Sequence, residues 1–393
     1  MRILHLVPSL DPATGGPAKV CLQLASALGQ LGHQTTVLTT DITLTGNVDS
    51  LSPIPGTRVL THHAYSIPHV LALSPSLLHR LRIEIPRHHI CHIHSLYFLH
   101  NVFAGYLCRL HGVPYIVRPH GTLDPYIRQK KSLRKSLFFA TFDRDLLNRA
   151  AGIHYTSQSE MELAADVRLL SPGFVIANGL DLSPFTLPQT KAFFSLYPQL
   201  LHRRIVLFLS RIHEKKGLDL LIPAFHKVSQ RIPDVQLVIA GPDDGYLSQA
   251  RHLVCQHRLE KCVSFLGMVH GPEKTGLLQA CEVFALPSYS ENFGIAVVEA
   301  LAAGKPVVVS KHVNIWNDIA TAGAGIVVES SVQATADALL EILQSRQLQL
   351  QMSNAASGLA AQAYSIQSVA KALVDKYDEL IRASASLPRK SNE

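Results

Sequence analysis

The sequence predicts an α/β protein of two Rossmann-like domains. Three observations support this prediction. The chain has 393 residues, which is enough for two hydrophobic cores. Short apolar segments of strand length alternate with longer segments of helical periodicity, and this alternation is typical of a parallel sheet. Apolar residues make up 47% and charged residues 17%, a composition of globular rather than disordered proteins.

The first strand-helix-strand unit opens the chain. Ile3–Val7 is a short apolar strand, Lys19–Leu31 carries apolar residues at helical spacing, and Thr35–Thr39 is the next strand. The glycines Gly15 and Gly16 precede the helix without forming a G-x-G-x-x-G motif. They predict a tight turn and give no support to a dinucleotide cofactor.

A later strand of the first domain ends in a candidate site residue. Residues 113–119 are apolar enough for a strand, and His120 follows directly in a Gly-containing loop. Open parallel sheets bind ligands at the carboxyl ends of their strands. Since the chain has 21 histidines and most histidines are structural, His120 stands out only by this position.

The segment 288–306 organises the second domain. An apolar strand, Val283–Leu286, is followed by a polar loop and by a helix over Ile295–Ala303, so Glu291 lies near the helix N-terminus. Free backbone N–H groups and the helix dipole make this a place for an anion, phosphate above all. Gly294 would allow the ligand to approach the backbone closely.

Glu299 is the unusual residue of this helix. Apolar residues surround it in the sequence, and a carboxylate in such a place needs a partner. A sugar or ribose diol is a natural one, because a carboxylate accepts hydrogen bonds from both hydroxyls.

A second strand-to-helix loop carries two cations. Arg211 follows the strand Arg204–Leu209, and Lys216 precedes Gly217 and the helix Leu218–Gln230. Two cations at one helix N-terminus repel each other unless an anion lies between them. A diphosphate supplies that anion, with arginine binding as a fork and lysine as a point charge.

These segments resemble the retaining family 4 glycosyltransferases (glycosyl transferases group 1), which have the two-domain GT-B fold. The E-x(7)-E spacing of Glu291 and Glu299 and the pair Arg211 and Lys216 carry the resemblance, together with Asn178–Asp181, which is similar to the family's N-G-V-D segment. The resemblance covers nearly the whole chain. The loop after residue 310 departs from the family's Gly-Gly-x-x-Glu form.

The resemblance implies an enzyme that moves a sugar from a nucleoside-diphosphate sugar to an acceptor hydroxyl with retention of configuration, in glycan, polysaccharide or glycolipid assembly. Arg211 and Lys216 would hold the diphosphate and stabilise the leaving group. Glu291 would bind donor-sugar hydroxyls, Glu299 the ribose, and His120 would hydrogen-bond near the reacting sugar. The other residues implied in donor binding are Gly15, Gly16, Val269, Asn292, Phe293, Gly294 and Ile295.

The same resemblance implies a division of the chain into two Rossmann-like domains that face a cleft. Residues 1–185 form the N-terminal acceptor domain and residues 186–362 the C-terminal donor domain, with the interdomain linker around 183–203. Residues 363–385 form a helix that packs back on the first domain.

No cofactor or metal is expected. Asp143 and Asp145 form a D-x-D pair, but they lie in a segment expected to be helical, where residues i and i+2 do not share a face. No other cluster has metal-ligand spacing.

The net charge of +7 is concentrated in the run 128–135, whose cations are Arg128, Lys130, Lys131, Arg134 and Lys135. Nucleic acid is not an expected partner, because no aromatic interleaving or binding module accompanies the run. An anionic membrane surface or a lipid-linked acceptor is one explanation, supported by Leu133, Leu137, Phe138 and Phe142 at helical spacing. A solvated helix face is the alternative.

The first residues read as a buried strand rather than a signal peptide, no apolar run reaches the length of a membrane span, and the six cysteines form no C-x-x-C pair. We therefore expect a cytoplasmic protein, with peripheral binding to the inner face of the membrane as a further expectation. The rival functions are a nucleotide-sugar epimerase or a phosphorylase on the same fold, or a basic membrane-binding non-enzyme. A phosphorylase would need a lysine that holds pyridoxal phosphate, and nothing marks one out.

Overall fold

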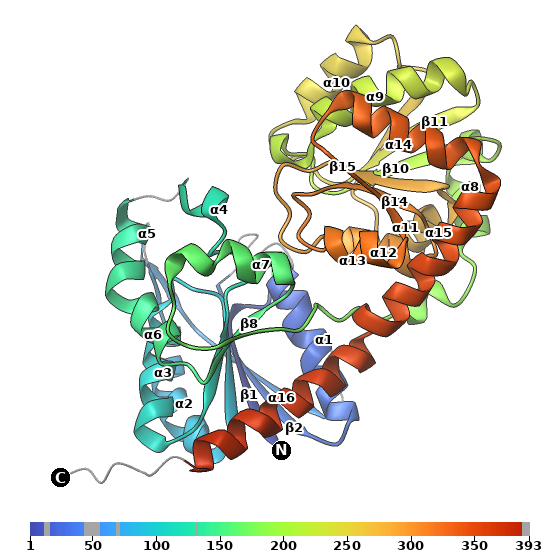
Figure 1. Ribbon diagram of the computed structural model, residues 1–393. Coiled ribbons are helices and arrows are strands. Elements are labelled where there is room, and N and C mark those ends of the chain that lie inside the picture. Colours follow the sequence, from blue (N-terminus) through green and yellow to red (C-terminus); the bar gives the residue numbers. More distant parts are fainter. Residues whose placement is uncertain (12–15, 43–55, 68–70, 130–132, 387–393) are drawn as a thin grey trace. The chain divides into compact units, whose positions relative to one another are not determined.

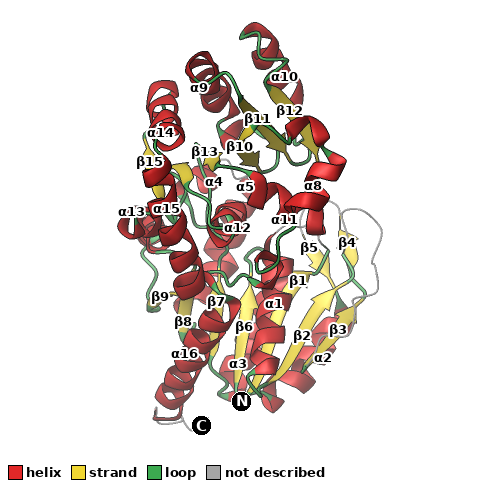
Figure 2. Ribbon diagram, turned by 90° about the vertical axis from the view of Figure 1, so that its right-hand side faces the viewer, coloured by secondary structure: helices red, strands yellow, loops and turns green. Residues whose placement is uncertain are grey.

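A computed structural model describes residues 1–11, 16–42, 56–67, 71–129 and 133–386 (Figure 1). Internal contacts divide the chain into two compact units, one of Met1–Gly179 with Ile366–Glu393 and one of Leu180–Ser365. Each unit is built on a parallel sheet (Figure 2) and is described here by itself. The chain passes from the first unit to the second after Gly179 and returns to the first at Ile366. These two crossings lie a few residues from the boundaries expected at 185 and 363.

The first unit has a seven-stranded sheet of strand order β3-β2-β1-β6-β7-β8-β9. Its strands are β1 (Arg2–Ser9), β2 (Gln34–Thr40), β3 (Thr57–His62), β6 (Ile90–His94), β7 (Tyr115–Arg118), β8 (Gly152–Tyr155) and β9 (Gly173–Val175). A separate antiparallel pair is formed by β4 (Tyr65–Ile67) and β5 (Leu71–Leu73). The strand order reverses between β1 and β6, and such a switch point is where open sheets bind ligands.

Helices cover both faces of this sheet. The helices of the first unit are α1 (Gly16–Gln30), α2 (Pro75–Glu84), α3 (Leu99–His111), α4 (Pro125–Gln129), α5 (Leu133–Phe138), α6 (Arg144–Asn148), α7 (Gln158–Leu163) and α16 (Ile366–Ser386). The predicted helix Lys19–Leu31 corresponds to α1, which begins earlier and has Pro17 in its first turn.

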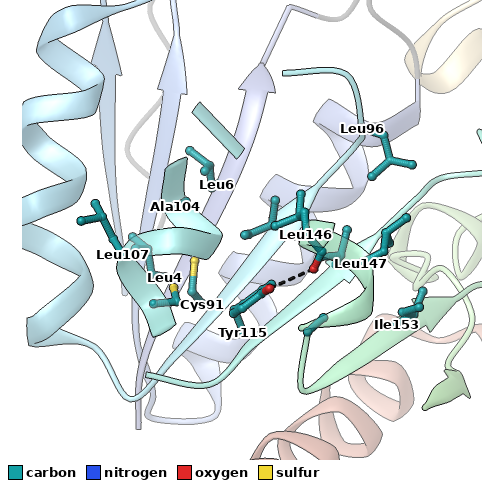
Figure 3. Packing of buried hydrophobic residues seen from close by; sticks show 14 of the residues in the cluster. Leu4, Leu6, Cys91, Leu96, Ala104, Leu107, Tyr115, Leu146, Leu147 and Ile153 are labelled. Atoms are coloured by element: carbon teal, nitrogen blue, oxygen red, sulfur yellow. Dashed lines mark hydrogen bonds between the residues drawn. The ribbon is translucent and has the colours of Figure 1, made fainter. Parts of the chain in front are cut away.

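Successive residues of β1 point to opposite faces of the sheet. Leu4 and Leu6 join the cluster that packs against α3 and α6, in which Tyr115 donates a hydrogen bond to the backbone oxygen of Leu146 over 2.9 Å (Figure 3). Ile3 points to the other face, where α1 and the buried side of α16 cover the sheet. The C-terminal helix is therefore part of the first unit's core.

The second unit has a six-stranded sheet of order β12-β11-β10-β13-β14-β15. Its strands are β10 (Arg204–Leu209), β11 (Val235–Ala240), β12 (Val263–Gly267), β13 (Val283–Leu286), β14 (Val307–Ser310) and β15 (Gly325–Val328). Its helices are α8 (Thr190–Leu196), α9 (Leu218–Arg231), α10 (Leu247–Gln256), α11 (Gly271–Ala280), α12 (Ile295–Ala302), α13 (Trp316–Ala322), α14 (Val332–Gln344) and α15 (Arg346–Leu359). The order reverses between β10 and β13, which pair directly.

The predicted linker around 183–203 is wrong. This segment contains α8, which packs against α11 and belongs to the second unit. Phe193 is fully buried, and a Cβ added to Gly276 would lie 2.6 Å from the Gln189 oxygen, so the two helices approach closely at a glycine. The helix has only one buried apolar residue, Phe193, so the sequence shows too little helical periodicity to predict it.

No helix within the described ranges combines the length and the apolar character needed to cross a membrane.

Candidate active site

Two loops meet at the carboxyl ends of the neighbouring strands β10 and β13. The backbone oxygen of Lys215 accepts hydrogen bonds from the Tyr289 N–H and the Ser288 hydroxyl, both over 2.8 Å. Gly217 has a φ of 76°, and a Cβ there would lie 2.1 Å from the Pro287 oxygen. Only glycine allows this approach, so Gly217 is required where the two loops touch.

Lys216 and Glu291 form an ion pair across this junction. The Lys216 side chain is 5% exposed and the Glu291 side chain 20% exposed. Burial alone would raise the pKa of Glu291, but the charge and hydrogen bond of Lys216, the charge of Lys215 and the Phe293 N–H outweigh it and lower the pKa. A buried cation and an ionised carboxylate are therefore held together at the switch point.

Arg211 lies on the same sheet edge with a different partner. Its guanidinium bonds to the Asp244 carboxylate over 2.6 Å, and both side chains are exposed. Asp244 belongs to the loop after β11, which lies against the β10 loop where a Cβ on Gly241 would be 1.9 Å from the Ser210 oxygen. Asp244 could not be predicted as a partner, because nothing in the local sequence connects it to Arg211.

The N-terminus of α12 completes this edge. Gly294 caps the helix with a left-handed backbone, at a φ of 76° and a ψ of 64°. The first turn of any helix has N–H groups without intrahelical partners, so this turn offers donors to an anion. Phe293 is buried and packs edge-on against the Tyr364 ring at 5.7 Å. Asn292 and Ile295 lie on either side of this buried anchor and its glycine cap.

The loop after β14 supports Glu291 through its backbone. The Glu291 N–H donates to the His312 oxygen over 2.9 Å, and the Glu291 oxygen accepts from the Asn314 N–H over 3.0 Å. This is the loop that departs from the family's sequence form. It fixes the backbone position of Glu291 without depending on that form.

Glu299 is buried in α12, and it has a cation as partner. Its carboxylate bonds to Lys274 of α11 over 2.6 Å. The prediction that a carboxylate in this apolar helix needs a partner is confirmed, but sequence analysis missed the lysine. Val269, in the loop after β12, is also buried.

The remaining predicted residues belong to the first unit. Gly16 is the first residue of α1, whereas Gly15 lies outside the described residues. His120 follows β7 with a positive φ of 53°, and its Nε2 lies 3.1 Å from Nδ1 of His94. Burial and the nearby Arg118 guanidinium lower the pKa of His120 well below its usual value. His120 is thus a neutral imidazole at neutral pH.

The Asn-Gly segment before the first crossing has a structural role that sequence analysis missed. Asn178 accepts a hydrogen bond over 2.6 Å from Arg118, whose guanidinium is fully buried. A Cβ on Gly179 would lie 2.9 Å from the Ile366 Cα. The amide thus solvates a buried charge, and the glycine allows the start of α16 to pack closely.

The Asp143 and Asp145 carboxylates have separate partners. As predicted, both lie in helical segments. Asp143 is buried and accepts from the Tyr97 N–H over 3.0 Å, whereas Asp145 is exposed and pairs with Arg109 and Arg149.

One other group could hold a metal among the residues that the structure describes. Ligand atoms of the buried residues His5, Cys21 and His94 lie within 4.8 Å of one another. Burial raises the pKa of the Cys21 thiol to about 12 against the opposing charge of Arg118. Metals bind the thiolate, and a buried guanidinium nearby disfavours a second cation. We therefore assign no metal to this group.

Comparison with known proteins identifies the chain. The family model of the glycosyl transferases group 1 matches residues 198–358, inside the second unit. The model of the glycosyl transferase 4-like domain matches residues 15–179, inside the first unit. Together the two models leave only the unit crossings and the chain ends unmatched.

The chain matches curated glycosyltransferases over most of their length. The chain is 27% identical to the GDP-mannose:cellobiosyl-diphosphopolyprenol alpha-mannosyltransferase of Xanthomonas oryzae pv. oryzae, covering 86% of each chain. It is also 27% identical to the D-inositol 3-phosphate glycosyltransferase of Arthrobacter sp., covering 95% of this chain and 93% of the relative.

Solved structures show the same fold. Anabaena HepE in complex with UDP and glucose has a TM-score of 0.75 at 20% identity, covering 96% of this chain and all of that one. Sucrose-phosphate synthase from Thermosynechococcus elongatus has a TM-score of 0.74 at 21% identity, covering 97% of this chain and 99% of that one. The class is thus a glycosyltransferase with the GT-B fold. The chain belongs to family 4 of these enzymes, as its sequence motifs predicted.

Proposed function

We propose that this glycosyltransferase uses a nucleoside-diphosphate sugar and transfers its sugar with retention of anomeric configuration. The observation that carries the proposal is the buried Lys216, held by Glu291 where the β10 and β13 loops meet, beside the N-terminus of α12. Arg211 adds a second, exposed cation on the same sheet edge. Two cations and a helix N-terminus suit a diphosphate.

The counterions suggest how the site changes when the donor binds. Without ligand, Glu291 neutralises Lys216 and Asp244 neutralises Arg211. An arriving diphosphate replaces the carboxylates as partner of both cations. Glu291 is then released from its lysine, and its ionised carboxylate accepts hydrogen bonds from the donor sugar's hydroxyls.

The same groups supply the chemistry. As the bond between the sugar and the phosphate breaks, negative charge grows on the leaving diphosphate, and Lys216 and Arg211 stabilise it. Lys216 contributes most, because its low exposure strengthens the interaction. Retention follows from departure and attack on one face of the sugar, with the leaving phosphate accepting the acceptor's proton. Glu299 binds the ribose hydroxyls beside its ion pair with Lys274.

In this proposal the enzyme needs no metal, since the two cations and the helix N-terminus already neutralise the diphosphate. We expect full activity in excess EDTA. Activity that EDTA abolishes and Mg²⁺ or Mn²⁺ restores would contradict this part of the proposal.

A panel of nucleotide sugars tests the donor class. A ligand that binds the folded protein raises its melting temperature by mass action. We expect nucleoside diphosphates and one or a few nucleotide sugars to stabilise the protein, and sugar phosphates without a nucleoside to have little effect. Epimer formation from the stabilising nucleotide sugar without any acceptor would instead favour an epimerase. No stabilisation by any member of the panel would contradict the proposal.

We propose further that the acceptor is presented at an anionic lipid surface. Leu133 and Leu137 of α5 are 86% and 67% exposed, and Arg134 and Lys135 lie between them. Exposed leucines at i, i+4 spacing beside cations fit a membrane surface. The named acceptor of the Xanthomonas relative, a diphosphopolyprenol, is of this lipid-linked kind.

The residues predicted to form the basic membrane-binding run have different surroundings in the structure. Arg128 pairs with Asp166 and Phe138 is buried, whereas Phe142 is exposed. Lys130 and Lys131 lie outside the described residues. The membrane proposal therefore rests on the exposed leucines and their neighbouring cations.

Sedimentation with vesicles containing an anionic lipid tests the membrane proposal. We expect salt-sensitive binding that a variant with Leu133→Ser and Leu137→Ser loses. A matched change at another exposed leucine, Leu350→Ser, should leave binding intact. Wild-type protein that stays in solution at low salt would contradict the proposal.

A further inference from the structure

The first sheet contains a buried polar layer that neither the sequence motifs nor the family match explains. His5 of β1, His92 and His94 of β6 and His154 of β8 are fully inaccessible to solvent. The buried Arg118 of β7 lies among them. Imidazoles are costly to bury unless they are hydrogen-bonded, so their bonding pattern matters.

The histidines form two separate hydrogen-bonded chains. In one, Nε2 of His120 lies 3.1 Å from Nδ1 of His94, and Nε2 of His94 lies 3.2 Å from Nδ1 of His5. In the other, Nδ1 of His154 lies 3.4 Å from Nε2 of His92, and Nδ1 of His92 lies 2.8 Å from the Tyr377 hydroxyl. Only the first chain ends at a predicted site residue.

Every ring in these chains is neutral. Burial lowers the pKa of His5 to about 3 and the pKa of His94 well below its usual value, and the Arg118 charge acts in the same direction. A neutral imidazole has one N–H donor and one acceptor nitrogen. The rings of a chain must therefore all donate in the same direction, and the end of the chain decides which.

The second chain has a fixed direction. His154 Nε2 lies 2.8 Å from the Ile176 backbone oxygen, which only accepts, so this nitrogen carries the proton. His154 Nδ1 must then accept from His92 Nε2, and His92 Nδ1 must accept from the Tyr377 hydroxyl. This chain is satisfied at both ends.

The first chain is open at its buried end. Nε2 of His5 is buried and has no hydrogen-bond partner among the described residues. An unpaired buried N–H is rarer than an unpaired buried acceptor. The proton of His5 is therefore on Nδ1, from which it donates to His94. His94 in turn donates from its own Nδ1 to Nε2 of His120.

We propose that His94 and His5 are positioning residues that hold His120 in the tautomer with its proton on Nδ1. His120 is partly exposed, and no described residue bonds to its Nδ1. It thus presents a fixed N–H donor, suited to a sugar hydroxyl or phosphoryl oxygen, and it is not a general base. The catalytic meaning of this inference rests on the proposed function, but the tautomer does not.

Nitrogen-15 NMR of the histidine-labelled full chain measures the tautomer directly, because protonated and unprotonated ring nitrogens resonate far apart. His120→Asn identifies the His120 signals by their loss. We expect the wild-type signals to show one neutral tautomer, protonated on Nδ1. A proton on Nε2, a doubly protonated ring, or zinc bound by the nitrogens of His5 and His94 would overturn the proposal.

Three variants test the positioning role. His94→Leu should release His120 to a mixture of tautomers, whereas His94→Asn, whose amide lies near the Nδ1 position, should preserve the wild-type tautomer. His92→Leu is the matched control, because it removes an equally buried ring from the second chain. It should leave the His120 signals unchanged. A His94→Leu protein with the wild-type tautomer would overturn the proposal.

Kinetics then test what the tautomer does, with the nucleotide sugar that stabilises the protein. We expect His94→Leu to lower kcat about tenfold, the size of one lost hydrogen bond, with KM nearly unchanged. His94→Asn should recover most of this loss. Equal rates for His94→Leu and His92→Leu would contradict the positioning role. If the NMR result holds but no nucleotide sugar is used, the proposed function fails and the tautomer assignment stands.

Discussion

The two units share a topology, but they place their polar groups differently. In the second sheet the strands β10, β11 and β13 carry almost only apolar side chains, and the charges lie in the loops at their carboxyl ends. In the first sheet the strands themselves carry buried histidines and Arg118. The second site is charged and built from loops. The polar layer of the first unit consists of uncharged histidine rings around one charged guanidinium, and it lies inside the core.

This difference explains what the sequence could predict. Arg211, Lys216 and Glu291 lie in loops between an apolar strand and a helix, where a charged residue stands out. The histidines lie on strands far apart in the chain, and each resembles an ordinary strand residue. Only the parallel pairing of β1 with β6, which sets His5 opposite His92, brings them together.

The comparison predicts that mild acid unfolds the first unit before the second. Folding lowers the pKa of the buried histidines His5, His92, His94 and His154. Below pH 6.5, the ordinary pKa of histidine, the unfolded chain therefore binds more protons than the folded one. Stability is then lost as the pH falls below 6.5. Each of these histidines adds to the loss, because each is protonated in the unfolded chain and neutral in the folded one.

The single tryptophan, Trp316, reports on the second unit alone. There the pKa of Glu291 is lowered from 4.5, so its contribution is lost only as the pH falls below that value. Between pH 7 and pH 5 we expect hydrogen exchange, corrected for its intrinsic pH dependence, to rise in first-unit peptides while Trp316 fluorescence stays native. Simultaneous loss of both signals above pH 5 would contradict the comparison.

Lys216 should matter most for activity. Lys216→Ala removes the least exposed cation of the second unit's site, and we expect kcat/KM to fall about a hundredfold, or about 3 kcal/mol. Lys215→Ala is the matched control. It removes the neighbouring lysine, which forms no ion pair with Glu291. It should lower kcat/KM by less than about threefold. Similar losses for both variants would show that general charge, rather than the Lys216 position, is what the site requires.

Gly217 tests whether contact between the two loops is required. Gly217→Ala and Gly323→Ala both place a side chain on a left-handed backbone, at φ of 76° and 66°. This backbone cost is about 1–2 kcal/mol in each. Only the first meets a backbone oxygen, since nothing lies within 4 Å of a Cβ on Gly323. We expect Gly217→Ala to lose about 2 kcal/mol more in urea unfolding. Equal losses would mean that the loops separate at little cost.

Much of the fold could be predicted from periodicity alone, because both units alternate short apolar strands with amphipathic helices. The family and most of the second unit's predicted residues followed from local motifs. What escaped prediction was long-range. Asp244 and Lys274 became partners of Arg211 and Glu299 only through loop and helix packing, and α8 was mistaken for a linker because its one strong anchor is Phe193.

The most direct test of the account compares diphosphate with monophosphate binding by isothermal titration, using UDP, GDP and their monophosphates. The account predicts that the better nucleoside diphosphate binds wild type at least about tenfold more tightly than its monophosphate, since each charge-assisted hydrogen bond contributes about 1.5–3 kcal/mol. In a folded Arg211→Ala, Lys216→Ala double variant this advantage should disappear. An undiminished preference for the diphosphate in the double variant would place the diphosphate elsewhere and contradict the account.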